Sequence, residues 1–141
     1  MVSLVETLSK RSCLTIDKNE QISTLASILK NHNIGCLVVL DKDTANPVGI
    51  VSERDLVKNF QKILNREIVL VKDIMTSNII SCDLSASSKE LMEVMTKKKI
   101  RHLPIIDNNK LLGIVSIGDV VNSIIFNYKE ETKFLKEYIS N

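Results

Sequence analysis

The chain has 141 residues, of which 44% are hydrophobic, and its 19 basic residues nearly balance its 17 acidic ones. This length suits one compact domain with a real core and is too short for two independent enzymatic domains. The formal net charge of +2 creates no strong field for a nucleic acid or a membrane surface, so neither is favoured as a partner.

The cysteines and the N-terminus indicate a reducing compartment. Cys13, Cys36 and Cys82 are odd in number and lie far apart among apolar residues, which favours buried reduced thiols over a disulfide framework or a metal cluster. An acid at Glu6 and a base at Lys10 interrupt the N-terminus before any long apolar run, which argues against a signal peptide or a membrane anchor. We therefore expect a soluble, cytoplasmic protein without a bound metal.

The first half predicts a strand, a helix, a hairpin and a second helix. The predicted elements are a strand at 13–16, a helix after Asp17 that ends at Gly35, strands at 37–40 and 48–51 joined by a turn, and a helix from 52 to about 65. Asp17 and Glu20 have the spacing of a capping box and are expected to begin the first helix.

The second half predicts the same order. Its elements are a strand at 78–81, a helix from 85 that includes 91–95, strands at 103–106 and 111–115, and a helix from 116. From Glu130 onward the pattern predicts a terminal helix that docks on the body or on a partner subunit, with Phe134, Leu135, Tyr138 and Ile139 on one face.

The order β-α-β-β-α therefore occurs twice. Neither half, at roughly 60 residues, buries enough apolar surface alone, so we expect one pseudo-two-fold body with an α/β (α+β) fold. The expected divisions are 1–68 for the first repeat, 69–127 for the second and 128–141 for the terminal helix.

One motif, Gly-Ile-Val-Ser-x-x-Asp, closes the last strand of each half, at 49–55 and at 113–119. Two copies in one small domain suggest two equivalent polar sites rather than one catalytic centre. Ser-x-x-Asp by itself is also a helix capping box, in which the Asp bonds only the backbone. Its duplication favours the ligand-binding interpretation.

These paired segments, the lead-in Asp73-Ile74-Met75-Thr76 and the run from Ile100 to Asp107 resemble tandem CBS (cystathionine-beta-synthase) domains over nearly the whole chain. The tail is similar to that of small bacterial stand-alone members. The resemblance implies a Bateman module, not an enzyme. Such a module binds adenosine-containing ligands (AMP, ADP, ATP, S-adenosylmethionine or NAD) in clefts between the repeats, forms disc-like homodimers and regulates a partner protein.

The resemblance also implies two crossed pockets, each with a carboxylate for the ribose hydroxyls and a serine for phosphate or sugar. One pocket joins Ser9, Leu14, Gly35 and Cys36 to Ser116 and Asp119. The other joins Met75, Ile80, Arg101 and His102 to Ser52, Arg54 and Asp55.

The two pockets differ in charge. Arg54, Arg101 and His102 favour an anionic nucleotide at the Asp55 pocket, whereas Lys10 and Arg11 are the cations near the Asp119 pocket. If Arg101 instead crowds the base slot, the small lining of the Asp119 pocket makes that pocket the roomier one. Both alternatives stay open.

Other functions have weaker support. The main alternative is a constitutive dimerisation or partner-docking module without a ligand. In that case the two Ser-x-x-Asp capping boxes only cap helices. The basic run from Lys97 to Arg101 could bind nucleic acid, but it lies at a predicted helix C-terminus, where cations are favourable, and it lacks aromatic residues. His32 and His102 have no metal-ligand spacing, and Cys36 and Cys82 lie in strand-like segments that do not suit a nucleophile.

Overall fold

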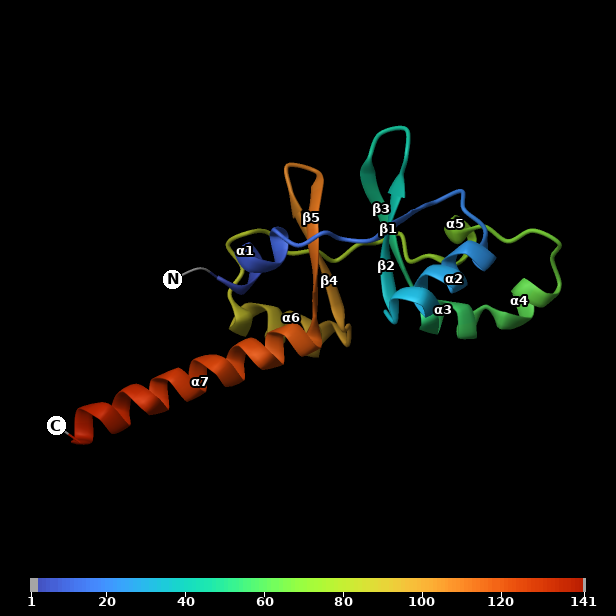
Figure 1. The fold of residues 1–141 in the computed structure, drawn as a ribbon. Helices are drawn as coiled ribbons and strands as arrows, with labels where there is room; N and C mark the ends of the chain where they lie inside the picture. Colours follow the sequence, from blue (N-terminus) through green and yellow to red (C-terminus); the bar gives the residue numbers. More distant parts are fainter. Residues whose placement is uncertain (1–2, 141) are drawn as a thin grey trace.

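The computed structural model describes residues 3–140 as two similar repeats whose β-hairpins stand side by side (Figure 1). After α1 (Leu4–Ser9), the first repeat contains β1 (Thr15–Asp17), α2 (Ile22–His32), β2 (Cys36–Asp41), β3 (Asn46–Ser52), α3 (Glu53–Lys58) and α4 (Phe60–Leu64). The second contains α5 (Val71–Ile74), α6 (Ser88–Lys98), β4 (His102–Asp107), β5 (Lys110–Ser116) and α7 (Ile117–Ser140). The mixed α and β fold with two repeats is as predicted.

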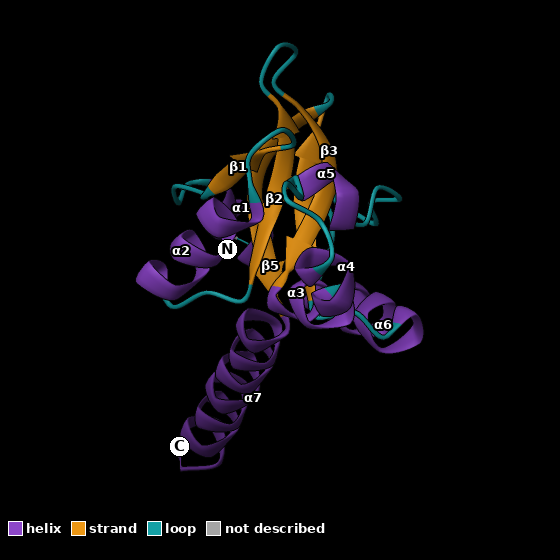
Figure 2. Cartoon of the chain, turned by 90° about the vertical axis from the view of Figure 1, so that its right-hand side faces the viewer, coloured by secondary structure: helices purple, strands orange, loops and turns teal. Residues whose placement is uncertain are grey.

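Both predicted hairpins are present, and they have matching registers. Val38 lies opposite Ile50 in the first hairpin and Pro104 lies opposite Ile114 in the second. β1 adds a parallel strand to the first hairpin. Figure 2 shows the strands of the two sheets gathered on one side of the molecule, with most helices below them.

The strand predicted at 78–81 is wrong. In this region, among the described residues, only Cys82 pairs with β4, through its N–H to the Pro104 carbonyl (2.9 Å) and its carbonyl to the Ile106 N–H (2.9 Å). One bridge does not extend into a ladder, so the second repeat has a two-stranded sheet.

Several helix boundaries also differ from the predicted ones. Asp17 does not cap α2, because its carboxylate accepts the N–H groups of Asn19 and Lys42 and the helix begins after Gln21. The helix predicted from residue 85 begins at Ser88, with Ser87 as its N-cap. The helix predicted from 52 to 65 divides at Asn59 into α3 and α4.

The two hydrophobic cores are connected by the N-terminal segment. Val5 and Leu8 of α1 are buried in the core of the second repeat, whereas Ile16 of β1 is buried in the core of the first. Residues 9–14 must therefore cross from one repeat to the other, and this crossing positions them at the boundary between the repeats.

The helix expected from 116 and the terminal helix expected from 130 are one continuous helix, α7, about 36 Å long at 1.5 Å per residue. It packs against α6, β5 and α1 near its start, where Val120 is buried. Its second half projects away from the body (Figures 1 and 2). Within residues 3–140, no helix combines the length and the apolar content needed to cross a membrane.

Candidate functional site

Both copies of the Ser-x-x-Asp motif form capping boxes. Asp55 Oδ2 accepts the Ser52 N–H at 2.8 Å and the Ser52 hydroxyl at 3.2 Å, and the Asp55 N–H donates back to Ser52 Oγ at 3.3 Å. The second copy repeats the two bonds that involve backbone N–H groups, with 3.0 Å from the Ser116 N–H to Asp119 Oδ2 and 3.1 Å from the Asp119 N–H to Ser116 Oγ. The boxes orient both carboxylates and leave Oδ1 of each without a hydrogen bond from the described residues.

A cavity of about 300 Å³ lies beside Asp119, on the boundary between the repeats. Asp119 and Ser116 come from the second repeat, and Leu14, Gly35 and Cys36 come from the N-terminal segment and the first repeat. Five of the six residues predicted for this crossed pocket therefore line one cavity. The remaining lining residues are Arg11, Ser12, Cys13, Ile34, His102 and Ile114.

A second cavity of about 460 Å³ continues the first toward Leu8 and Gly113. Both cavities are lined by Arg11, Ser12, Cys13 and Ile114, so together they form one groove along the outer edge of β5. Their sizes are within the range of cavities that hold nucleotide-sized ligands.

The edge of β5 in this groove offers free backbone groups. Ile114 lies opposite Pro104, which has no N–H, and the alternating pattern of an antiparallel pair directs the Ile114 N–H and carbonyl away from β4. No segment within residues 3–140 pairs with Ile114 on that side.

The corresponding edge in the first repeat is closed. There, Ile50 exchanges two hydrogen bonds of 2.9 Å with Thr76. Met75 covers Gly49 so closely that a Cβ on this glycine would lie 2.6 Å from the Met75 sulfur. Residues Met75 and Thr76 thus cover the edge of β3 in the first repeat, whereas the corresponding edge of β5 beside Asp119 is open.

The groove has few charged groups. Arg11 Nη2 lies 3.5 Å from Asp119 Oδ2, and the two side chains are 58% and 27% exposed. Burial lowers the pKa of His102, and the Asp119 charge opposes this shift, so its imidazole is neutral at pH 7. Burial, with the nearby charge of Asp55, raises the pKa of Cys36 to about 12, which keeps this thiol protonated. The groove thus holds one opposed pair of charges among apolar and neutral groups.

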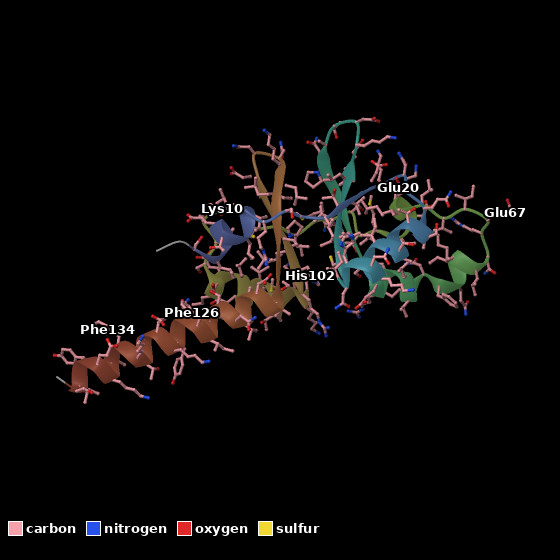
Figure 3. All side chains as sticks on the ribbon, in the orientation of Figure 1. Lys10, Glu20, Glu67, His102, Phe126 and Phe134 are labelled. Atoms are coloured by element: carbon pink, nitrogen blue, oxygen red, sulfur yellow. The ribbon has the colours of Figure 1, made fainter. Side chains whose placement is uncertain are left out.

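The residues predicted for the Asp55 pocket are less closely grouped. His102, predicted there, lines the Asp119 cavity, because β4 begins at the boundary between the hairpins (Figure 3). Met75 packs on the first core and Ile80 on the second. Arg54 and Arg101 are exposed and form no salt bridge within residues 3–140.

Ser9, predicted for the Asp119 pocket, instead donates its hydroxyl to the Glu6 carbonyl at 2.7 Å and does not line either cavity. The prediction did not include Ser12, Cys13, Ile34 or Ile114. Ile114 could have been found from the motif itself, because it lies between Gly113 and Ser116. Ile34 directly precedes Gly35, which was predicted. Ser12 and Cys13 carried no signal, since their position depends on how the N-terminal segment crosses.

Comparison with known proteins identifies the repeats. The model of the CBS domain matches residues 5–62 and, again, residues 71–125. The mitochondrial CBS domain-containing protein CBSX3 of Arabidopsis thaliana is 35% identical over 118 residues, which are 79% of this chain and 56% of that protein. The chain thus spans little more than half of that relative.

Two solved structures are similar over most of their length. The CBS-domain containing protein ATU1752 from Agrobacterium tumefaciens has a TM-score of 0.76 and 36% identity, covering 84% of this chain and 90% of its own. The CBS domain pair of protein MJ0100, solved with 5′-methylthioadenosine and S-adenosyl-L-methionine, has a TM-score of 0.75 and 27% identity, covering 92% and 99%. With two matching repeats over most of its length, this chain belongs to the CBS-domain family and is a tandem CBS pair, or Bateman module.

Proposed function

We propose that this protein is a regulatory module that binds an adenosine-containing ligand of the AMP, ADP or ATP class in the groove beside Asp119. The groove itself is the main support for this proposal. It brings a capped carboxylate, an open strand edge and apolar side chains from both repeats into one continuous space.

Each part of an adenosine ligand has a suitable partner in this groove. The free oxygen of Asp119 can accept the ribose hydroxyls, and the Ser116 hydroxyl retains its proton to donate. The Ile114 N–H and carbonyl can hydrogen-bond the edge of the base, while Leu14 offers an apolar surface to its face. The adenosine ligands in the MJ0100 pair support this class of ligand.

A ligand in this groove would contact both repeats. It would therefore stabilise the arrangement of the repeats that the structure has, at the expense of any arrangement that opens the groove. We propose that this difference is how ligand binding alters the activity of a partner protein, without catalysis by the module itself.

The test is thermal unfolding of the full chain with AMP, ADP, ATP, NAD and S-adenosylmethionine. A ligand that binds the folded state at one hundred times its Kd stabilises it by about 2.7 kcal/mol. We expect at least one of these ligands to raise the melting temperature of the wild type and not that of Asp119→Ala.

Asp55→Ala is the matched control. Both substitutions remove a capping box and should cost about 0.5–2 kcal/mol in the absence of ligand. Asp55→Ala should keep the ligand-induced shift. A shift lost in Asp55→Ala and kept in Asp119→Ala would assign the ligand to the other pocket and contradict the proposed site.

A second candidate function is a constitutive homodimerisation or partner-docking module that needs no ligand. It is favoured by exposed apolar side chains on α3, α4 and α7, among them Val57 (75% exposed), Phe60 (57%) and Tyr138 (75%). Folded protein whose melting temperature responds to none of the five ligands would support this function over the first.

A further inference from the structure

The ion pair between Arg11 and Asp119 has no counterpart in the other repeat. In both capping boxes the carboxylate accepts the backbone N–H of the serine. Arg11 lies beside Asp119, but no cation among the described residues lies within salt-bridge distance of Asp55. Because the ligand proposed above would use the Asp119 carboxylate, this cation lies where the ligand must bind.

Arg11 is held at its backbone and free at its head group. Its N–H donates to the Leu8 carbonyl at 3.1 Å, which anchors it at the end of α1. Its side chain is 58% exposed, and its distance to Asp119 is 3.5 Å, which is longer than a good charged hydrogen bond. The guanidinium can therefore leave the carboxylate at little cost.

The guanidinium is also the principal positive charge available to a ligand. Arg11 lines both parts of the groove, so a ligand in either part is within its reach. His102 is neutral at pH 7 because burial lowers its pKa, and Lys10 does not line either cavity. With Arg11 and Asp119 opposed, the side chains that line the groove carry no net charge at pH 7.

We propose that Arg11 makes the groove selective for nucleosides that carry a phosphate. This inference rests on the function proposed above. Ribose hydroxyls displace the guanidinium from Asp119, and a phosphate then receives its parallel N–H groups in a bidentate hydrogen bond. A neutral nucleoside leaves Arg11 without a partner. A cationic one, such as a sulfonium nucleoside, is repelled by it.

The experiment is calorimetric titration of the full chain with adenosine, AMP and S-adenosylmethionine. We expect the wild type to bind AMP more tightly than the other two. Arg11→Gln should weaken AMP binding by about tenfold or more, the usual effect of losing a charged hydrogen bond, and leave adenosine binding within a few-fold.

Lys10→Gln is the matched control, because it removes the same charge from an exposed neighbour outside the groove and should leave the ratio of AMP to adenosine affinity unchanged. An equal ratio in the wild type and Arg11→Gln would overturn the selectivity while leaving the proposed function intact. Tighter binding of S-adenosylmethionine than of AMP by the wild type would overturn the selectivity and the AMP, ADP or ATP class, and would leave only the binding of an adenosine-containing ligand. Failure of all three ligands to bind folded protein, together with no response of its melting temperature to ADP or ATP, would instead reject the proposed function, and the selectivity with it.

Discussion

Asp55 and Asp119 share the two backbone hydrogen bonds of a capping box but have different surroundings. Each accepts the backbone N–H of its own serine, as the repeated motif requires. Arg11 and His102, which come from other segments of the chain, lie beside Asp119 in the groove. At the scale of single residues, the distinct chemistry of the second copy thus comes from its neighbours and not from the motif.

His102 should make stability depend on pH. Its pKa in the folded state is lowered mainly by burial, from an ordinary value of 6.5. The unfolded chain therefore takes up this proton at a higher pH, and the free energy of unfolding falls as the pH drops through 6.5 toward the folded-state pKa. Urea unfolding at about pH 7.5 and about pH 5.5 should show a smaller acid loss for His102→Gln than for the wild type.

His32 provides the control for this measurement, because it lies exposed near the end of α2. His32→Gln should lose as much stability on acidification as the wild type. Equal losses in His102→Gln and the wild type would mean that the imidazole is not buried in solution as it is in the structure.

α7 has a buried apolar side chain near its start and exposed ones near its end. Near its start, Val120 is fully buried in the second core, while Phe134, Tyr138 and Ile139 further along are 68%, 75% and 80% exposed. Figure 3 shows Phe126 and Phe134 on the projecting part of the helix. Amphipathic spacing alone predicts a helix with an apolar face, but the face is covered only where the body reaches it.

We therefore expect unequal effects from two substitutions in α7. Val120→Ala should reduce the free energy of unfolding by about 2 kcal/mol, because it removes buried methyl groups. Ile139→Ala should change it by less than about 0.5 kcal/mol. Urea unfolding at several protein concentrations measures both, and a large, concentration-dependent effect of Ile139→Ala would reveal that an assembly of copies covers the end of the helix.

At the scale of the whole molecule, the N-terminal segment joins the two repeats. Leu8 is buried in the core of the second repeat and Ile16 in that of the first. The segment between them lines the groove, through Arg11 and Leu14. The same crossing that couples the cores therefore also builds the candidate site.

Leu8→Ala should consequently destabilise the distant end of the chain. We expect a loss of about 2–5 kcal/mol, because the side chain is only 5% exposed. Hydrogen exchange should show the amides of β4 and β5 losing protection, although they lie about 100 residues away in sequence. Leu64→Ala, at a 66% exposed position, should have little effect, and equal effects of the two would contradict the crossing.

Local patterns predicted most elements well. The hairpins near 37–51 and 103–115 were correct, because β-branched runs and turn residues act over a few positions. The strand at 78–81 was wrong, because a strand needs a partner and only Cys82 finds one in β4. α1 was not predicted as a helix, and its stability comes from burying Val5 and Leu8 in a distant core.

For the candidate site, too, local features could be predicted and long-range contacts could not. The two repeats, their strand-to-helix motifs and both capped carboxylates could be predicted from sequence alone, because these features depend on residues within a few positions of each other. The fold was needed to show that Asp119 has the open groove, that His102 lines this groove and that Arg11 pairs with Asp119. These features depend on contacts between segments far apart in the chain, which form only when the two cores pack together.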